Sequence, residues 1–575
     1  MLTRAFRIGV ANLSPGRKPS STSRSLSHQA QDSTPRRSWG SSIVRTLILG
    51  SAIGAGCWVG SGDKPYRRMK LLYIIPLRMA RNVVTASEMV TDYMVTLYGI
   101  SEGTVEMENA RHEVHLRNAE RLKNLCFKNG GIYIKLGQHI GQLDYLVPRE
   151  FVQTMRASTL NKCPIQTFAQ VRDVFLAELG LYPSEIFAEF SEVPMASASL
   201  AQVHAARTHD GRKVAVKVQH THLTDTSDAD IHTVDFIVHV GHWLFPHFDY
   251  RWLVAEMRES LPNELDFMKE GKNAEQCVEN FAKMSPHIAP NIYVPQVFWE
   301  ISTPRLMCME FMEGMGVTDV TAMKEHGIDP KDVAHLISET FAEMIFHHGF
   351  VHCDPHAANM MLRVKPGTEN EPQLILLDHG LYKTLGPELR SNYANLWKAL
   401  VFAKVDDIKA YSLKMGAGED LYTLFASILT MRPWRKVVAK SHDHLQFSAE
   451  PEDVDEIQDY ASNSLLKITE LLRRLPRVIL LLLKTNDCLR AVDNALGAPT
   501  NSFVIVGRAS SNAVSELQRT GPAAPILKLW DKLEVETRLW VWQTAAAAFS
   551  AEINFLKLGI FVVPAVLLVY LRRMN

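Results

Sequence analysis

Cysteine is scarce in this chain, and its distribution narrows the class of protein. The 575 residues contain seven cysteines, an odd number, and none of them is paired at a short spacing. This pattern suits a protein of a reducing compartment rather than a disulfide-linked scaffold. There is also no H-E-x-x-H sequence, so the most common helical zinc motif is missing.

The chain also lacks a net charge, because its 62 basic residues balance its 62 acidic residues. Its isoelectric point is about 7.4. The composition therefore gives no reason to expect nucleic acid as a partner. Hydrophobic residues make up 46% of the chain, which is enough for a sizeable core, and the length allows more than one domain.

Long hydrophobic runs are also missing, since a bilayer-spanning helix needs roughly twenty apolar residues. Residues 43–60 form a glycine-rich apolar stretch that is interrupted by Arg45, and residues 558–571 form a second, shorter stretch. Both suit a buried or interfacial helix as well as a membrane span. We expect at least one of them to contact a membrane, and the sequence does not choose between them.

Acidic residues are almost absent from the first forty positions, where Asp32 is the single carboxylate among seven basic residues and many serines. This composition predicts a mitochondrial presequence over residues 1–42 and a mitochondrial location, with the inner membrane favoured. A disordered basic tail is the alternative interpretation.

Two acidic motifs stand out between His347 and Leu385. The first is H-C-D-P-H-A-A-N, in which Asn359 follows Asp354 by five residues, the spacing of the catalytic loop of protein kinases. The second is Asp378-His379-Gly380, which follows a short apolar run as D-F-G follows a strand in kinases. Phosphoryl transfer needs hard oxygen ligands for Mg²⁺ and a positioned carboxylate, which predicts Asp378 and Asn359 as metal ligands and Asp354 as the catalytic group.

The same stretch also suggests a zinc site, because His348, His352 and His356 recur every four residues. Gly349 and Pro355 argue against one continuous helix there, so we disfavour this alternative.

A hairpin is predicted upstream, where Asp210-Gly211 separates two alternating runs. The second run ends in V-A-V-K, whose lysine, Lys217, is typical of the phosphate-binding lysine of a kinase strand. The loop before the hairpin has alanine and serine where a glycine-rich phosphate loop would have glycine. Its small side chains still let backbone N–H groups approach phosphate, and they belong to Ala196, Ser197, Ala198 and Ser199.

Pro262 predicts the start of a helix that carries both Glu264 and Glu270. Six residues correspond to about 120° around a helix, so we expect the two carboxylates to address different partners. Helices are also predicted over residues 66–165 and from Leu385 to residue 550, with a strand and hinge near Arg305 to Gly314.

Taken in order, these motifs resemble the UbiB or aarF-domain-containing atypical kinase family over about residues 110–500. Further support comes from Lys135-Leu136-Gly137-Gln138, a K-x-G-Q sequence on an apolar helix, and from Glu264-x-Asp266. The D-H-G triplet and L-L-L-K-T-N-D suggest the mitochondrial branch that carries D-H-G.

The resemblance implies roles for residues of this sequence. It implies ATP and Mg²⁺ as cofactors, with Lys217 on the phosphates and paired with Glu270. It also implies that the helix of Lys135 and Gln138 folds across the site, with Lys135 contacting Glu264. Such a cover favours ATP hydrolysis or a lipid-like acceptor over an ordinary protein substrate. Ala357-Ala358 replaces the family's Pro-Gly, and His379 replaces phenylalanine, but all ligating residues are kept.

We therefore expect an α+β, bilobal protein-kinase-like fold that acts as an atypical kinase or ATPase. The expected divisions are a helical extension (66–165), an N-lobe (166–314), a C-lobe (315–500) and C-terminal helices (501–575). Two other classes remain open at this point: a pseudokinase scaffold that organises a membrane complex, and a structural membrane protein that binds no nucleotide.

Overall fold

The computed structural model describes residues 65–550 apart from residues 102, 142–146, 160–162, 164, 222, 245–249, 440–464, 499–500 and 519–522. The predicted presequence (1–42) and the two candidate membrane segments (43–60 and 558–571) lie outside the described residues and stay predictions. Within the described part of the chain, no helix is both long enough and apolar enough to cross a bilayer.

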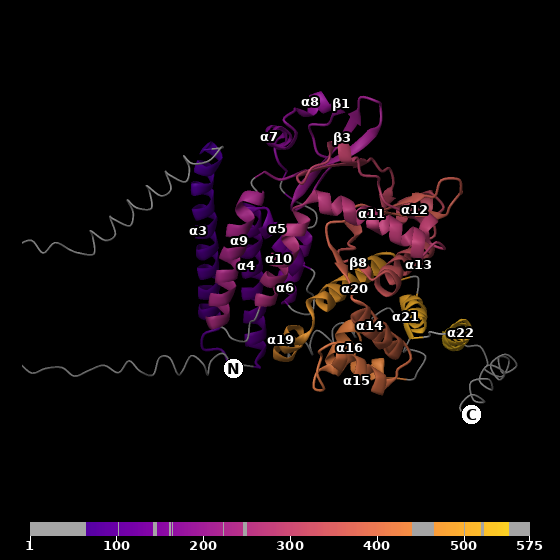
Figure 1. Ribbon diagram of the computed structural model, residues 1–575. Helices are drawn as coiled ribbons and strands as arrows, with labels where there is room; N and C mark the ends of the chain where they lie inside the picture. Colours follow the sequence, from indigo (N-terminus) through magenta and orange to yellow (C-terminus); the bar gives the residue numbers. More distant parts are fainter. Residues whose placement is uncertain are drawn as a thin grey trace, which may run out of the picture.

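A layer of helices precedes the sheet, as predicted for residues 66–165. Its members are α3 (Pro65–Thr96), α4 (Val105–Asn129), α5 (Ile132–Ile140) and α6 (Arg149–Thr159). Two later helices, α9 (Leu223–Leu244) and α10 (Arg251–Glu264), pack into the same layer, beside α3 and α5 (Figure 1). A shared apolar core joins them, in which Ile132 and Ile134 contact residues of α9 and α10.

The upper sheet has the strand order β1-β3-β4-β6, with β2 paired to β3. Its strands are β1 (Phe187–Phe190), β2 (Ala196–Ser197), β3 (Ala201–Thr208), β4 (Lys213–Gln219) and β6 (Leu306–Glu310), flanked by α7 (Phe168–Leu179) and α8 (Pro183–Ile186). The predicted hairpin is confirmed, since β3 and β4 pair antiparallel around Gly211, whose φ is +89°.

The side chains of β4 alternate between the two faces of the upper sheet. Val214, Val216 and Val218 are buried in the core that includes Val171 and Phe175 of α7. Successive side chains of a strand point to opposite faces, so Ala215 and Lys217 face the other side, where Ala215 packs near Phe267. Lys217 is thereby aimed at helix α11 (Phe267–Met284).

The predicted helix start at Pro262 is wrong. Pro262 lies inside α10, which ends at Glu264, and the next helix, α11, begins at Phe267 with Asp266 as its N-cap. The Asp266 side chain accepts a hydrogen bond from the backbone N–H of Met268 at 3.1 Å, which satisfies one of the free donors of the first turn. Asp266 is a stronger start signal than Pro262 because it supplies this acceptor. Glu264 and Glu270 therefore lie on two helices, not one.

The lower lobe combines small sheets with many helices. The strands are β5 (Ile292–Tyr293), β7 (Met315–Gly316), β9 (Met360–Val364) and β10 (Pro372–Leu376) in one sheet, and β8 (Phe350–His352) with β11 (Tyr382–Thr384) in another. The short 3-10 turns of this lobe include η1 (Ala289–Asn291) and η4 (Ala357–Asn359), whereas η2 (Trp299–Ile301) packs against β6 of the upper sheet. The helices include α12 (Val320–Glu325), α13 (Pro330–Ala342), the π-helical turn η3 (Glu343–His348), α14 (Pro387–Val401), α15 (Val405–Lys414), α16 (Tyr422–Thr430) and α17 (Trp434–Val437).

Four further helices complete this lobe: α19 (Leu465–Arg474), α20 (Arg477–Ala495), α21 (Ser502–Gln518) and α22 (Ala524–Ser550). The largest apolar core joins α14, α16, α19, α20 and α21. Below the sheet, Figure 1 shows α20 passing close to β8, so a C-terminal helix reaches the level of the predicted catalytic loop. The α+β, two-lobed architecture predicted from the sequence is confirmed.

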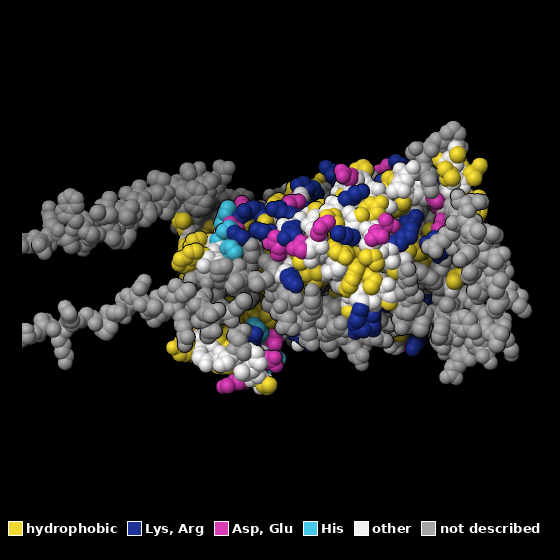
Figure 2. All heavy atoms as spheres, turned by 90° about the horizontal axis from the view of Figure 1, so that it is seen from below, with side chains coloured by type: hydrophobic (Ala, Val, Ile, Leu, Met, Phe, Trp, Pro, Cys, Tyr) yellow, Lys and Arg dark blue, Asp and Glu magenta, His cyan; other side chains and the backbone are white. Residues whose placement is uncertain are grey.

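Basic and acidic side chains are mixed on the surface, as the balanced composition suggests. On the face shown in Figure 2, lysines and arginines lie among aspartates and glutamates, with hydrophobic side chains between them. This face is not dominated by one sign of charge.

Candidate active site

Lys217 is the centre of the first charge cluster. Its Nζ atom lies 2.7 Å from Oε1 and 2.9 Å from Oε2 of Glu270, and 3.3 Å from Oδ2 of Asp378. Strand β4 supplies the lysine, α11 supplies Glu270, and the turn after β10 supplies Asp378. Three elements far apart in the sequence therefore converge on one ammonium group, as the resemblance implied for Lys217 and Glu270.

These neighbours change the protonation of the cluster. Burial opposes the charge of Lys217, but Asp378 and Glu270 outweigh it and raise its pKa above the usual value. Burial raises the pKa of Glu270 to about 7, against the opposite charge of Lys217. For Asp378, burial is outweighed by Lys217 and by the backbone N–H of Gly380, which together hold its pKa below the usual range. Two carboxylates thus compete for one lysine, and Asp378 keeps its negative charge.

Asp378 is also the most accessible member of the cluster. Its side chain is 37% exposed, whereas those of Lys217 and Glu270 are 11% and 2% exposed. A Cβ atom added at Gly380 would lie 3.1 Å from Oδ1 of Asp378, so a side chain there would crowd this carboxylate. The glycine leaves the space beside Asp378 open.

Asn359 is brought beside this cluster by the backbone. The N–H of Leu377 donates to the carbonyl of Asn359 at 2.9 Å, which ties the segment before Asp378 to the end of the catalytic loop. The Nδ2 atom of Asn359 donates to the carbonyl of Asp354 at 3.0 Å. Its Oδ1 atom is therefore the part of the side chain that is suited to ligate a cation.

Asp354 follows strand β8 and is 8% exposed. The β8–β11 pairing and the hydrogen bond from the N–H of Cys353 to the carbonyl of Leu381 fix the loop beside the D-H-G turn. Burial acts against the charge of Asp354, but Lys484, His356 and Lys135 hold its pKa well below the usual value. The carboxylate is therefore ionised and able to accept a proton or orient a hydroxyl group.

The helix α5 (Ile132–Ile140), here called the cover helix, reaches this carboxylate. Lys135 Nζ lies 2.7 Å from Oε2 of Glu264 and 3.6 Å from Oδ2 of Asp354. Gln138 is half-buried on the same helix. The contact between Lys135 and Glu264 that the resemblance implied is present, and the contact between Lys135 and Asp354 places the cover helix against the predicted catalytic loop.

Lys484 is a site residue that the sequence reasoning missed. Its Nζ atom lies 2.9 Å from Oδ1 of Asp354, and its side chain is 7% exposed. In the sequence, Lys484 contributed only to the L-L-L-K-T-N-D resemblance and was given no role in the site. Its single signal in the sequence is a lysine that follows an apolar block on α20, where a buried cation needs a buried anion as partner.

His139 also belongs to the site and was not assigned a role. It is buried on the cover helix, and its Nε2 atom has no hydrogen-bond partner among the described residues. Burial and the charges of Lys484 and Lys135 lower its pKa well below the usual value. A neutral imidazole therefore lies near Asp354, four residues after Lys135.

The alanine-rich loop folds tightly onto its own sheet. The N–H of Ala198 donates to the carbonyl of Ala201 at 2.7 Å, and the carbonyl of Ala198 is hydrogen-bonded to Nε2 of His220 at 3.0 Å. Ala196 and Ser197 form β2, and Ser199 is buried. None of these four residues has a positive φ, so the loop needs no glycine to turn. Its contact with phosphate stays a prediction.

His379 replaces an aromatic ring of the D-F-G motif with another flat ring. It stacks on Tyr382 at an interplanar angle of 9°, and its ring nitrogens are hydrogen-bonded to the Tyr382 hydroxyl and the Leu376 carbonyl. Burial lowers its pKa to about 3. The neutral imidazole therefore fills a buried position and leaves Asp378 as the charged group of the triplet.

The three histidines spaced by four do not lie on one helix face. His348 ends η3 and is hydrogen-bonded to Ser285, His352 lies on β8, and His356 precedes η4. Among the residues that the structure describes, no group of three or more His, Cys, Asp or Glu side chains is arranged to hold a metal ion.

Comparison with known proteins places these features in a family. A family model described as the ABC1 atypical kinase-like domain matches residues 158–412. A putative ABC1 protein of Arabidopsis thaliana is 55% identical over 516 residues, which cover 87% of this chain and 96% of that protein. The AarF domain-containing protein kinase 1 of Mus musculus is 40% identical over 76% of this chain and 82% of its own length.

Among solved structures, the complex of Rv3197 with erythromycin from Mycobacterium tuberculosis matches 67% of this chain and 97% of that chain, at 22% identity and a TM-score of 0.38. The sequence matches cover 96% and 82% of these two relatives, and the lysine, glutamate and aspartate motifs lie together in the structure. The chain therefore belongs to the ABC1 or AarF-domain family of atypical kinase-like proteins.

Proposed function

We propose that this protein binds Mg-ATP between its lobes and transfers or hydrolyses the γ-phosphate as an atypical kinase or ATPase. The observation that carries the proposal is the meeting of Lys217, Glu270 and Asp378, with Asn359 tied to the same turn. When bound, Mg-ATP supplies the phosphoryl group and the charge that the site must neutralise. Lys217 is the residue to hold the phosphates, and Glu270 orients this lysine.

The donor set fits a magnesium ion. Asp378 and Asn359 offer hard oxygen atoms, which Mg²⁺ prefers. Lys217 is shared between Glu270 and Asp378, and Asp378 keeps its negative charge, so one lysine only partly offsets the charge of this pair. A divalent cation beside the accessible Asp378 would offset the remainder.

The cover helix supports a small or lipid-like acceptor, or water, rather than an ordinary protein substrate. Asp354 is held by Lys135 on one side and Lys484 on the other, and it is 8% exposed. A polypeptide segment has little access to a carboxylate enclosed in this way. Asp354 then orients or deprotonates the hydroxyl group or water that reaches it.

Phosphate release from Mg-ATP by the purified full-length chain tests this activity. We expect release by the parent and a loss of about a hundredfold or more in Asp354→Asn, the range typical of a general base. Asp406→Asn, a change of an exposed residue on α15, is the matched control and should keep the parent rate. Equal rates in the parent and Asp354→Asn would contradict catalysis at this site.

That last result would favour the alternative function, a pseudokinase scaffold. The observation on its side is that Asp354 is already ion-paired with two lysines. Such a scaffold would retain nucleotide binding through Lys217 while hydrolysing nothing.

We also propose that the protein acts at a mitochondrial membrane. Support comes from apolar side chains that are exposed on α3 and α22, including Tyr73 (70%), Val95 (71%), Ile526 (74%) and Leu529 (59%). These two helices are the described elements nearest in sequence to the two apolar segments, 43–60 and 558–571. Co-flotation with liposomes, which we expect for the full-length chain, tests this part; a chain that stays with the soluble fraction would contradict it.

A further inference from the structure

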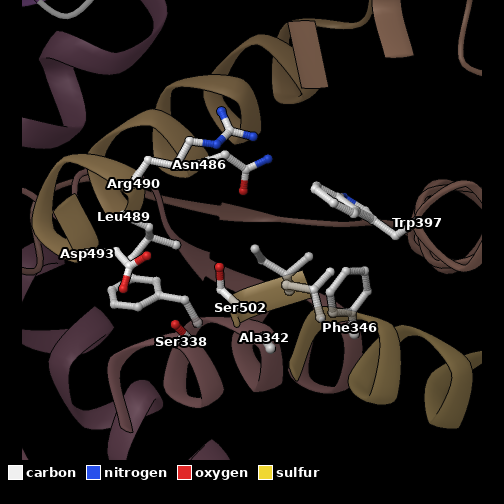
Figure 3. Close-up of a pocket in the computed structure, with 12 residues that line it drawn as sticks. Ser338, Ala342, Phe346, Trp397, Asn486, Leu489, Arg490, Asp493 and Ser502 are labelled. Carbon is white, nitrogen blue, oxygen red and sulfur yellow. The ribbon is translucent and has the colours of Figure 1, made fainter. Parts of the chain in front are cut away.

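A second cavity lies in the lower lobe, away from the charge clusters of the candidate active site. Its walls come from α13, η3, α14, α20 and α21 (Figure 3). Its volume is about 50 Å³, which is room for a few water molecules or a short ligand but not for a nucleotide. Helix α20 carries both Lys484, which reaches Asp354, and the cavity residue Asp493, so the two sites share one helix.

One end of this cavity is lined by polar side chains, and two of them lack hydrogen-bond partners among the described residues. Asp493 is 6% exposed, and neither of its carboxylate oxygens has a hydrogen-bond partner among the described residues. The hydroxyl of Ser502, which is 7% exposed, is likewise unpartnered there. Figure 3 shows the side-chain oxygens of Asp493, Ser502 and Ser338 at the same end of the cavity. A buried carboxylate without a donor is costly, so this end is built for a group that donates hydrogen bonds.

The polar neighbours on α20 do not serve this carboxylate. Arg490 pairs with Asp487 at 2.8 Å and also donates to the carbonyl of Leu429. Asn486 donates to the hydroxyl of Tyr393 at 3.1 Å. In Figure 3 the guanidinium of Arg490 points away from Asp493. Arg490 is therefore committed elsewhere, and no described residue of the chain donates a hydrogen bond to the carboxylate of Asp493.

The rest of the cavity is apolar. Phe341, Phe346 and Trp397 line it together with aliphatic side chains. A hydrocarbon group placed against these rings would be removed from water, which favours binding. The cavity thus offers an anionic, hydroxyl-bearing end and an apolar wall.

We propose that this cavity binds a small primary ammonium ion that carries a short hydrocarbon tail. An ammonium group has three N–H donors, and the site offers three acceptors: the carboxylate of Asp493 and the hydroxyl oxygens of Ser338 and Ser502. The opposite charge at Asp493 selects a cation over a neutral alcohol of the same shape. This site is separate from the proposed nucleotide site and does not depend on catalysis.

Calorimetric titration of the purified full-length chain with methylammonium chloride, whose two heavy atoms fit a cavity of about 50 Å³, tests the proposal, with methanol as a neutral ligand of the same length. Variants Asp493→Asn and Ser502→Ala remove the charge and one acceptor, and Asp406→Asn is the control for loss of a carboxylate at the surface. We expect saturable binding of methylammonium to the parent and to Asp406→Asn, at least about tenfold weaker binding to Asp493→Asn, and a smaller loss in Ser502→Ala.

Three results would overturn the proposal: no saturable binding of methylammonium to the parent, equal binding to Asp493→Asn, or methanol binding as tightly as the ammonium ion. The first result would mean that the cavity holds only water. If Asp493→Asn does not fold, the comparison of the two ligands and the Ser502→Ala variant still decide the matter.

Discussion

Asp354 lies between two lysines that come from opposite ends of the chain, Lys135 on the cover helix and Lys484 on α20. Both lysines stabilise the ionised carboxylate. In ordinary kinase chemistry this group would have to move a proton. Whether Lys484 only anchors the loop or also sets the protonation of Asp354 is decided by a pH profile.

Replacing Lys484 with methionine removes the closer of the two lysine charges, so the pKa of Asp354 should rise. Since the proposed role of Asp354 requires its ionised form, the acidic limb of the pH–rate profile should move to higher pH. Breaking a buried ion pair should also lower the free energy of unfolding by about 3 kcal/mol. Lys484→Arg keeps the charge and should keep the position of the limb. An acidic limb that stays in place in Lys484→Met would show that Lys484 only supports the fold.

Burial raises the pKa of Asp493 from 3.8 to about 6, and this shift predicts a pH-dependent stability. The folded state binds a proton at Asp493 more tightly than the unfolded state does, so the protonated carboxyl stabilises the fold at low pH. That stability is lost as the pH rises through about 6. Asp493→Asn should therefore raise the free energy of unfolding at pH 7.5 by roughly 2 kcal/mol.

Urea denaturation of the parent and Asp493→Asn at pH 7.5 and pH 3.5 measures this effect. The gain should disappear at the lower pH, where Asp493 is protonated in both states. A variant that is less stable than the parent at pH 7.5 would mean that Asp493 has a partner in solution.

Site residues that belong to a short sequence motif could be predicted, whereas site residues that lie far from these motifs in the sequence could not. Lys217, Asp354 and Asp378 were found because each stands at a fixed place in a short pattern. Lys484 contacts Asp354 across a long stretch of chain, and no local spacing reports such a contact. His139 was visible beside Lys135, but its burial among charged groups depends on how the cover helix docks.

At the scale of elements, the turn at Gly130-Gly131 sets the direction of the cover helix. Gly131 has a φ of +57° with a ψ of −123°, a conformation that essentially only glycine adopts. A Cβ atom there would lie 2.7 Å from Cδ1 of Leu223. The side chain of Leu223 can shift, but the backbone strain cannot be relieved in this way.

Gly131→Ala should therefore lower the free energy of unfolding by about 1 to 3 kcal/mol, as measured by denaturant unfolding. Gly241→Ala is the matched control, because Gly241 lies inside α9 and an added Cβ atom would have no atom within 4 Å. That change should be neutral or stabilising by about 0.5 to 1 kcal/mol. Equal effects of the two substitutions would show that the turn imposes no special conformation on the cover helix.

Elements with a local stop or turn signal were predicted well. The β3–β4 hairpin, for example, follows from Asp210-Gly211. The boundary between α10 and α11 was misplaced because Pro262 was read as a start, although Asp266 is the N-cap. The expectation that Glu264 and Glu270 have different partners is confirmed, but the reason is that they lie on different helices.

At the scale of the whole molecule, alternating charges connect the helical layer with the lower lobe. Glu264 of α10 contacts Lys135, Lys135 contacts Asp354, and Asp354 contacts Lys484. A second connection joins Glu259 of α10 to Lys383 and Arg477 in the lower lobe. The order of the motifs could be read from the sequence, but the packing of α9 and α10 with the N-terminal helices could not, because it depends on long-range burial of their apolar faces.

Nucleotide binding at Lys217 and Asp378 is measured most directly by the thermal stability of the full-length chain with and without Mg-ATP. A ligand at a hundred times its Kd should add about 2.7 kcal/mol of stability. We expect this stabilisation in the parent and in Asp406→Asn, and its loss in Lys217→Ala and Asp378→Ala. Folded parent protein that shows no stabilisation at millimolar Mg-ATP, or equal stabilisation of all four proteins, would contradict nucleotide binding at Lys217 and Asp378.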